Sequence, residues 1–320
     1  MDGKTPRILL TGANGQVGIE LRRVLPSLGN VVEAVRAPDA GARANDRVPL
    51  DLSDVDQIRQ VVREVQPDLI VNAAAYTAVD RAEREYEESL RINGTAPGVL
   101  AEEAKRLGAS IVHYSTDYVF DGAGTKPWLE TDATQPLNAY GRTKLAGEQA
   151  IRDLDVPHLI LRISWVYGLG RGNFVTAILN RAADHETLTV VADQVGAPTS
   201  ARVVADSTLQ ILKRCRGEYA GVLRERGGIV HLTCAGTTSW HGFATEIVRL
   251  ARAAGLPLAA KRVDPITAAE YPTPARRPAN SRMDLGLLTS RFDLSPPAWD
   301  AALAEIFPEI IASRSNAVAS

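Results

Sequence analysis

The sequence Arg7-Ile8-Leu9-Leu10-Thr11-Gly12-Ala13-Asn14-Gly15-Gln16-Val17-Gly18 joins an apolar run to a turn that holds three glycines. The run is typical of a buried strand, and a helical pattern follows the turn. In this setting the first glycine permits a tight turn, the second lets the backbone approach a pyrophosphate, and the third lets the helix pack on the strand. The stretch therefore predicts a βα unit that binds a dinucleotide.

The same rhythm of strand and helix continues through the first half of the chain. Strands are expected at 7–11, 31–35, 47–50, 68–73, 110–115 and 158–163, and helices at 16–28, 53–65, 82–107 and 139–154. Apolar runs that alternate with helical segments are the pattern of a parallel sheet covered on both faces. The fold class is therefore α/β, with a doubly wound parallel Rossmann-type sheet.

The pattern becomes irregular beyond Tyr167 and predicts a smaller C-terminal α/β substrate-binding domain. We assign residues 1–167 mainly to the Rossmann domain, 168–313 mainly to the substrate-binding domain, and 314–320 to a tail. The segment near 201–233 is expected to return to the Rossmann domain. Helices are expected at 174–183, 201–213, 240–254 and 298–313, and strands at 187–191 and 229–233. Three prolines exclude regular structure at 271–278, where two arginines suggest a lid or a phosphate clamp.

Composition limits the classes of partner. Lys and Arg number 36 against 38 Asp and Glu, a net charge of -2, so no basic field favours nucleic acid or a membrane surface. We find no leading apolar segment and no run of about 20 apolar residues, and we expect a cytoplasmic protein. The two cysteines, Cys215 and Cys234, lie in no metal-binding pattern and should be reduced thiols.

Tyr140 and Lys144 carry the clearest chemical signal. Residues four apart share one face of a helix, and there an ammonium can lower the pKa of a phenol from about 10 toward working pH. The tyrosine then becomes a general acid or base. Thr116 follows the fifth expected strand, where its hydroxyl can hold the same substrate oxygen. Thr116, Tyr140 and Lys144 are the expected catalytic residues of hydride chemistry at a carbonyl or an alcohol.

The second expected strand indicates which dinucleotide binds. NAD enzymes usually end this strand with a carboxylate that holds the adenosine ribose, but here Val35 and Arg36 stand at that position. An arginine suits a 2′-phosphate, so NADPH is the preferred cofactor and NADH the alternative, in case Arg36 is an ordinary solvated charge. The expected cofactor contacts are Gly12, Asn14, Gly15, Gln16, Val17, Gly18, Arg36, Asp51, Leu52, Ala73, Ala74, Ala75, Tyr140 and Lys144.

Seven ordered blocks together resemble one family, dTDP-4-dehydrorhamnose reductase of the extended short-chain dehydrogenases. The blocks are Gly15-Gln16-Val17-Gly18, the segment from Asn72 to Asp80, the segment from His113 to Phe120, Tyr140-Gly141-Arg142-Thr143-Lys144 with the four residues that follow, Ser164-Trp165-Val166-Tyr167, the segment from Asp193 to Thr199, and the loop from Tyr271 to Ser281. The resemblance runs from about Ile8 to about Phe307.

The resemblance implies a reaction and a substrate site. A family member transfers hydride from NADPH or NADH to C4 of dTDP-4-dehydro-β-L-rhamnose, so Tyr140 would protonate the oxygen while Lys144 tunes the tyrosine. The implied substrate contacts are Thr77, Val79, Thr116, Asp117, Trp165, Asn173 and Arg277. Asn173 and Arg277 would meet the nucleotide diphosphate, with Arg276 as an alternative to Arg277.

Two further alternatives remain at this point. A related nucleotide-sugar epimerase or dehydratase would retain NAD, and a non-catalytic regulatory subunit like that of methionine adenosyltransferase shares the reductase-like fold. Some family members also dimerise around Mg²⁺ held by carboxylates. Here Arg202-Val203 stand where a glutamate would be needed, and Glu20 alone is insufficient. We therefore expect no metal, and a monomer or a weak homodimer.

Overall fold

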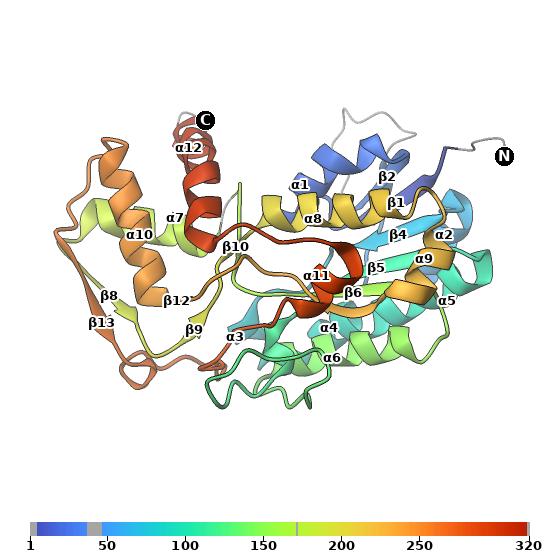
Figure 1. Cartoon of the computed structure of the whole chain (residues 1–320), viewed down its shortest axis with the longest axis horizontal. Coiled ribbons are helices and arrows are strands. Elements are labelled where there is room, and N and C mark those ends of the chain that lie inside the picture. The colour runs from blue at the N-terminus through green and yellow to red at the C-terminus, as the bar shows by residue number, and fades with distance from the viewer. Residues whose placement is uncertain (1–4, 37–46, 171, 319–320) are drawn as a thin grey trace.

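The core is a seven-stranded parallel sheet in the order β11-β6-β5-β4-β1-β2-β3 (Figure 1). The computed structural model describes residues 5–36, 47–170 and 172–318. The sheet strands are β1 (Arg7–Thr11), β2 (Asn30–Val35), β3 (Arg47–Pro49), β4 (Leu69–Asn72), β5 (Ser110–Thr116), β6 (His158–Ile163) and β11 (Gly228–His231). The doubly wound Rossmann-type sheet that the sequence predicts is confirmed.

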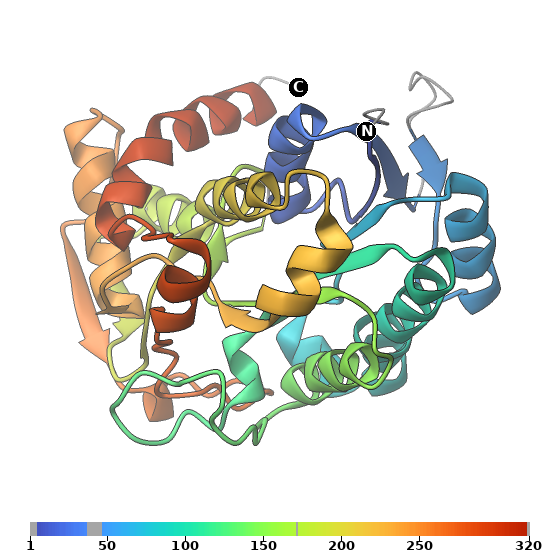
Figure 2. The same cartoon turned by 45° about the vertical axis from the view of Figure 1, so that its right-hand side comes forward.

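Side chains that alternate along the strands build a core on each face of the sheet. Ile8 and Leu10 of β1 belong to the cluster under α1 (Gln16–Val24) and α8 (Ala201–Arg214). Leu9 between them belongs to the cluster under α2 (Val55–Val65) and α5 (Ala96–Leu107). In the turned view of Figure 2, α1 and α8 still lie on one side of the sheet and α5 on the other. Ile8, Leu9 and Leu10 are all apolar because this part of the strand is buried on both faces of the sheet.

The expected helix at 82–107 is wrong in its form. The segment contains α3 (Val79–Ala82), α4 (Tyr86–Leu90), the π-helical turn η2 (Arg91–Thr95) and then α5. Pro97 lacks an N–H group, so the regular hydrogen-bond ladder cannot pass through it. The Asn93 side chain turns toward Tyr76, where it bonds the backbone N–H and C=O at 2.9 and 3.0 Å. Through this contact the irregular turn is hydrogen-bonded to the segment that follows β4.

A second, smaller group of helices and strands lies beside the large sheet. It contains α7 (Phe174–Asp184), β8 (Thr187–Val191), α10 (Trp240–Ala253), β13 (Arg262–Ile266) and α12 (Trp299–Val318), which lie together on the left of Figure 1. Their apolar faces share one core. Strand β13, which pairs with β8 in parallel, is not among the strands expected from the sequence. The last helix is expected to end at Ser313, whereas α12 continues to Val318.

Residues 201–233 pass back to the large sheet. Helix α8 packs beside α1, and β11 pairs with β6. The remaining elements are α6 (Ala139–Arg152), α9 (Tyr219–Arg226), α11 (Gly286–Phe292), β7 (Val166–Tyr167), β9 (Val195–Gly196), β10 (Thr199–Ser200) and β12 (Thr238–Ser239). Within the described residues, no helix combines the length and the apolar character that a membrane crossing requires.

Candidate active site

The glycine turn lies at the carboxyl end of β1, and its shape requires glycine at two positions. Gly12 adopts φ +69°, and a Cβ atom there would lie 2.5 Å from the backbone nitrogen of Ala74. A Cβ atom on Gly18 would lie 2.0 Å from the carbonyl oxygen of Gly12. The turn therefore packs directly against the end of β4, and α1 packs directly on the turn.

The first turn of α1 presents backbone N–H groups without a competing side chain. Gly15 is the N-cap residue and supplies no side-chain hydrogen bond, and the first turn contains no acidic residue. Asn14 is exposed, Val17 is half-buried, and the side-chain oxygen of Gln16 has no partner in the described part of the chain. Free N–H groups and the positive end of a helix dipole fit a pyrophosphate.

Arg36 lies where the adenosine end of a dinucleotide would come. The side chain is exposed at the end of β2, while residues 37–46 lie outside the described residues. Hydrogen bonds from Ser53 lower the pKa of Asp51, and the positive charge of Arg36 lowers it further. Leu52 is buried beside Asp51, and Ala73, Ala74 and Ala75 form a half-buried edge after β4. A guanidinium and a carboxylate therefore lie near each other at this edge of the sheet, and the contact of Arg36 with a 2′-phosphate stays a prediction.

Thr116 and Tyr140 meet where β5 ends and α6 begins. Asn138 caps α6 by accepting a hydrogen bond from the Gly141 N–H at 2.8 Å, which fixes Tyr140 in the first turn. The Tyr140 ring packs edge-on against Tyr118, with ring centroids 5.7 Å apart. The Thr116 hydroxyl is 5% exposed and close enough to influence the phenol. The two hydroxyl groups can therefore hold a single substrate oxygen.

The surroundings of Tyr140 raise the pKa of its phenol in this structure. Burial raises it, the Thr116 hydroxyl lowers it, and the negative charge of Asp117 raises it. A raised pKa keeps the phenol protonated, and a general acid must be protonated to act. The stabilisation of the tyrosinate by Lys144 stays a prediction.

Lys144 is buried and held by β5. Its Nζ donates to the carbonyl oxygen of Tyr114 at 2.6 Å and lies 3.1 Å from Nε2 of His113. Burial lowers the pKa of Lys144 to about 8, while the negative charge of Glu148 acts in the opposite direction. The ammonium therefore titrates near working pH.

Ser115 is turned away from the site by a buried ion pair. Its hydroxyl donates to Glu148 at 2.5 Å, and Glu148 pairs with Arg162 at 2.7 and 2.9 Å. Arg162 also lies over the Phe120 ring, 4.9 Å from its centroid. Because Ser115 and Thr116 alternate along the strand, Thr116 is the hydroxyl left on the site side.

Asp117 is a buried carboxylate beside Thr116. Burial raises its pKa to about 6, and the nearby hydroxyls of Ser281, Thr116 and Ser164 lower it in part. Its Oδ1 accepts a hydrogen bond from Thr116 at 3.1 Å, whereas Oδ2 has no partner among the described residues. The hydroxyl oxygens of Ser164 and Ser281 also lack a hydrogen bond of good geometry among the described residues, although both lie close enough to Asp117 to lower its pKa. Three buried hydroxyl groups therefore gather around one carboxylate at this place.

Trp165 follows β6 in a strained conformation. Its φ is +49°, and its ring stacks on Trp240 with centroids 3.6 Å apart and planes 8° from parallel. A non-glycine residue adopts this φ at a cost that surrounding packing must offset. Thr77 is exposed after β4, and Val79 begins α3.

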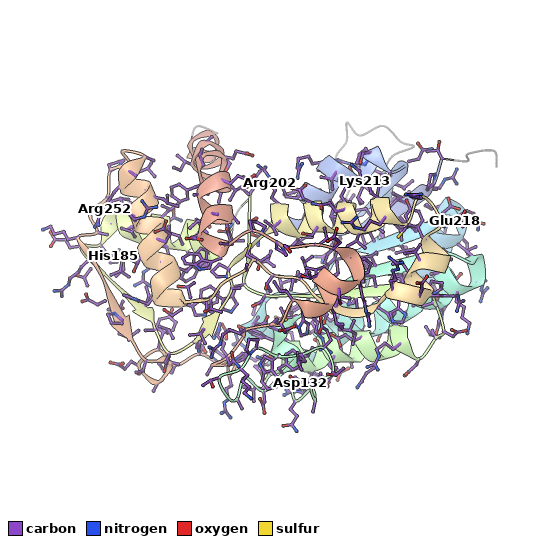
Figure 3. The ribbon with its side chains drawn as sticks, in the orientation of Figure 1. Asp132, His185, Arg202, Lys213, Glu218 and Arg252 are labelled. Carbon is purple, nitrogen blue, oxygen red and sulfur yellow. The ribbon has the colours of Figure 1, made fainter. Side chains whose placement is uncertain are left out.

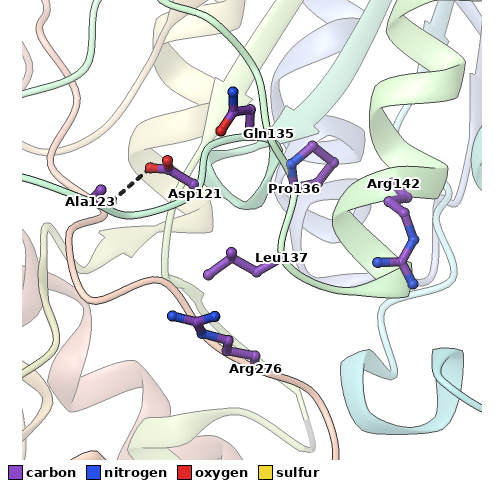
Figure 4. A pocket seen from close by; sticks show the side chains of 7 residues that line it. All are labelled: Asp121, Ala123, Gln135, Pro136, Leu137, Arg142 and Arg276. Atoms are coloured by element: carbon purple, nitrogen blue, oxygen red, sulfur yellow. Dashed lines mark hydrogen bonds between the residues drawn. The ribbon is translucent and has the colours of Figure 1, made fainter.

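The two arginines of the proline-rich loop have different surroundings. Arg277 pairs with Asp80 at 2.8 Å. Arg276 instead lines an open pocket of about 520 Å³ (Figure 4). The other lining residues are Asp121, Ala123, Gln135, Pro136, Leu137 and Arg142. Asn138, the cap of α6, donates to the backbone carbonyl of Arg276 at 2.8 Å, so the pocket adjoins the catalytic helix.

Asn173 has a structural task at the start of α7. Its Oδ1 accepts from the Thr176 N–H at 3.1 Å, and its Nδ2 donates to the Gly168 carbonyl at 2.9 Å. The reciprocal contact from the Thr176 hydroxyl completes a capping box. Both ends of the amide are therefore engaged, and its contact with a diphosphate stays a prediction.

Arg202 lies where a metal site that bridges two protomers would need a glutamate. It pairs with Glu309 of α12 at 2.5 Å and with buried Glu20 of α1 at 3.3 Å. Figure 3 labels Arg202 at the end of α8 that faces α12. Over the described ranges, no group of three or more His, Cys, Asp or Glu is arranged to hold a metal ion. One guanidinium thus bridges these two carboxylates within one chain, and Arg23 adds a second positive charge beside Glu20.

Comparison with known proteins covers nearly the whole chain. A family model described as RmlD substrate binding domain matches residues 6–311. The chain is 42% identical over 309 residues to the dTDP-4-dehydrorhamnose reductase of Escherichia coli (strain K12), which covers 96% of this chain and 99% of the relative. The chain belongs to the dTDP-4-dehydrorhamnose reductase family. It is therefore an oxidoreductase, and the resemblance stated from the sequence is confirmed.

Two further relatives of this chain carry the same family name. A dTDP-4-dehydrorhamnose reductase from Burkholderia thailandensis is 45% identical over 300 residues, which is 93% of this chain and 96% of the relative. A solved dTDP-4-dehydrorhamnose reductase from Bacillus anthracis str. Ames, in complex with NADP, has a TM-score of 0.80 and 31% identity. That match covers 96% of this chain and 100% of the solved chain.

Family membership does not explain every polar group that the structure gathers at the site. Sequence reasoning assigned no role to His113, which contacts Lys144, or to Ser164 and Ser281 beside Asp117. His113 begins the segment from His113 to Phe120 that resembles the family, three residues before Thr116 on the same strand. Its place in that segment is the one sequence signal of a role at the site, because a histidine in a buried strand is ordinarily a core residue.

Proposed function

We propose that this chain reduces the C4 ketone of dTDP-4-dehydro-β-L-rhamnose to give dTDP-L-rhamnose. NADPH bound at the glycine turn would supply the hydride. The observation that carries the proposal is the meeting of Thr116 and Tyr140 at the carboxyl edge of the sheet, next to buried Lys144. The names of the relatives and the NADP complex from Bacillus anthracis support the same substrate and cofactor.

Three side chains of the protein carry out and support the proton transfer. Tyr140 gives its proton to the O4 oxygen as negative charge develops there, and Thr116 donates a hydrogen bond to the same atom. The Lys144 ammonium stabilises the tyrosinate that remains and would reach the nicotinamide ribose. One hydride and one proton reach the ketone, so an alcohol forms and the atoms balance.

A binding and turnover assay separates this proposal from its alternatives. The reductase should release its nucleotide on purification and oxidise added NADPH only when the keto sugar is present. An epimerase or dehydratase that retains NAD would carry bound nucleotide, visible in its absorbance, and would leave NADPH unchanged. A regulatory subunit would turn over neither substrate.

Arg36→Ala should raise the KM for NADPH by about tenfold or more, because a charged hydrogen bond to the 2′-phosphate is lost. The KM for NADH should change much less, since NADH carries a hydroxyl at that position. Initial rates with both cofactors measure the effect, and NADH serves as the internal control. Equal changes in the two constants would remove Arg36 from cofactor selection.

We propose further that Arg276, rather than Arg277, reaches the substrate diphosphate, because Arg277 is already paired with Asp80. Arg276→Ala should weaken dTDP binding by about tenfold in calorimetry, the effect of one lost charged contact. Arg277→Ala is the matched control and should weaken it less. If Arg277→Ala has the larger effect, the assignment implied by the resemblance is restored.

A further inference from the structure

Four buried polar side chains form a continuous row from the first strand to the catalytic lysine. Thr11 Oγ1 donates to Asn72 Oδ1 at 2.6 Å, Asn72 Nδ2 lies 3.0 Å from His113 Nδ1, and His113 Nε2 lies 3.1 Å from Lys144 Nζ. The register of β1, β4 and β5 places Thr11, Asn72 and His113 directly opposite one another. Each of the four side chains is at most 1% exposed.

We propose that His113 is a positioning residue: as a neutral imidazole it accepts a hydrogen bond from the Lys144 ammonium and anchors that ammonium, through Asn72 and Thr11, to the strand that enters the glycine turn. The proposal rests on the proposed function, because it concerns how Lys144 is kept ready for Tyr140. Burial and the charge of Lys144 hold the pKa of His113 well below its usual value, so the ring is neutral when the lysine is charged.

The donors and acceptors of the row fix the position of the ring proton. An ammonium has donors only, so Nε2 of His113 must present its lone pair to Lys144. The ring proton then sits on Nδ1 and is donated to the Asn72 side-chain oxygen. The Asn72 amide nitrogen in turn donates to Thr11. In the structure the Asn72 nitrogen faces His113 and its oxygen accepts from Thr11, so this assignment requires the amide turned by a half rotation and a slightly longer contact with Thr11.

Loss of a proton from the Lys144 ammonium reverses the direction of each hydrogen bond in the row. A neutral amine has a lone pair, which can accept from a proton on Nε2 of His113. Nδ1 then accepts from the Asn72 amide nitrogen, and Asn72 accepts from the Thr11 hydroxyl. The protonation of Lys144 and the tautomer of His113 are therefore coupled. In both states one direction of Lys144 is used by Tyr114 and one by His113, which leaves the third for the reacting groups.

Few other charges act on the ammonium. Its own helix carries Tyr140, Glu148 and the exposed Arg142 and Arg152, and Arg162 of β6 pairs with Glu148. Asp117 follows β5 and acts on Tyr140. The charged side chains of α3, α4, η2 and α5, and of the turn after α3, are paired with other groups or exposed. The pairs are Asp80 with Arg277, Arg81 with Glu85, Glu88 with Arg91, Glu103 with Arg63 and Arg106, Glu102 with Arg59, and Glu83 with Arg142. Arg84, Glu87 and Lys105 are exposed.

NMR of the unmodified enzyme tests the row directly. The chain has five histidines, and of the lysines in its described part Lys144 alone is buried, so both side chains can be assigned. Side-chain ¹⁵N shifts should place the His113 proton on Nδ1 below the Lys144 midpoint and on Nε2 above it. The midpoint itself is read from the ¹³Cε shift of Lys144. A proton on Nε2 below that midpoint would overturn the proposal.

His113→Phe should lower the Lys144 midpoint by about one pH unit, because the charged form loses an acceptor. His113→Gln returns an acceptor near Nε2 and should restore most of the shift. His231→Phe removes another fully buried histidine of the same sheet and should leave the midpoint in place. An unchanged midpoint in His113→Phe would also overturn the proposal, and the measurement on unmodified enzyme decides the matter if that variant does not fold.

The pH profile of turnover separates this proposal from the proposed function. If the reaction needs the ammonium, the alkaline limb of kcat should move to lower pH in His113→Phe, together with the Lys144 midpoint. A midpoint that moves without the limb keeps the role of His113 and removes Lys144 from the reaction. Normal turnover with an unmoved midpoint keeps the proposed function and removes the role of His113.

Discussion

Tyr140→Phe is expected to lower kcat by a factor of roughly 10² to 10⁴, the usual loss when a general acid is removed. The phenol lies at the start of α6 beside Thr116. Binding of NADPH should stay nearly unchanged, since phenylalanine keeps the ring that packs on Tyr118. Steady-state kinetics and cofactor titration measure the two effects.

Tyr114→Phe is the matched control. It also removes one buried hydroxyl, but that hydroxyl bonds Thr208 at 2.9 Å, within the core between the sheet and α8. Turnover should stay within a few-fold of the unmodified enzyme. Near-normal turnover in Tyr140→Phe would assign the proton to another group.

Glu148→Gln should lower the free energy of unfolding by about 3–5 kcal/mol, because the buried Arg162 guanidinium loses the carboxylate to which it is hydrogen-bonded. Arg162 is 2% exposed and Glu148 is fully buried, so water cannot replace the lost carboxylate. The Ser115 hydroxyl also loses a charged acceptor. Urea unfolding at neutral pH measures the change.

Two further variants serve as controls for the stability loss expected in Glu148→Gln. Glu102→Gln breaks the partly exposed pair with Arg59 and should cost less than about 1 kcal/mol. The double change Glu148→Leu with Arg162→Met removes both buried charges and should recover much of the lost stability. A loss below 1 kcal/mol in Glu148→Gln would mean that Arg162 has found solvent or another partner.

The elements with the strongest local patterns were predictable from the sequence. The glycine turn, with an apolar run before it, predicted β1 and α1, and the apolar runs at 158–163 and 187–191 matched β6 and β8 to the residue. The segment 82–107 was not predictable in the same way. Its helical periodicity persists across η2, and Pro97 is a local signal for a break. The Asn93 contact with Tyr76, which holds the irregular turn in place, joins two separate segments and has no local signal.

The active-site residues were predictable as types and less so in their surroundings. The spacing of Tyr140 and Lys144 follows from helix geometry, but the direction of the lysine depends on His113 and Tyr114, which belong to another element. The same limit applies to the loop arginines. Their sequence showed two neighbouring charges, and only the fold showed that Asp80 takes one of them.

The central claim is the delivery of hydride to C4 of the nucleotide sugar. The direct measurement uses NADPH deuterated at the nicotinamide C4 on the transferred face, with dTDP-4-dehydrorhamnose made enzymatically in the same tube and the product analysed by NMR. We predict dTDP-L-rhamnose with one deuterium at C4 of the sugar and one NADPH oxidised for each product formed. A product without deuterium at C4, or a sugar of the opposite configuration at that carbon, would contradict this account.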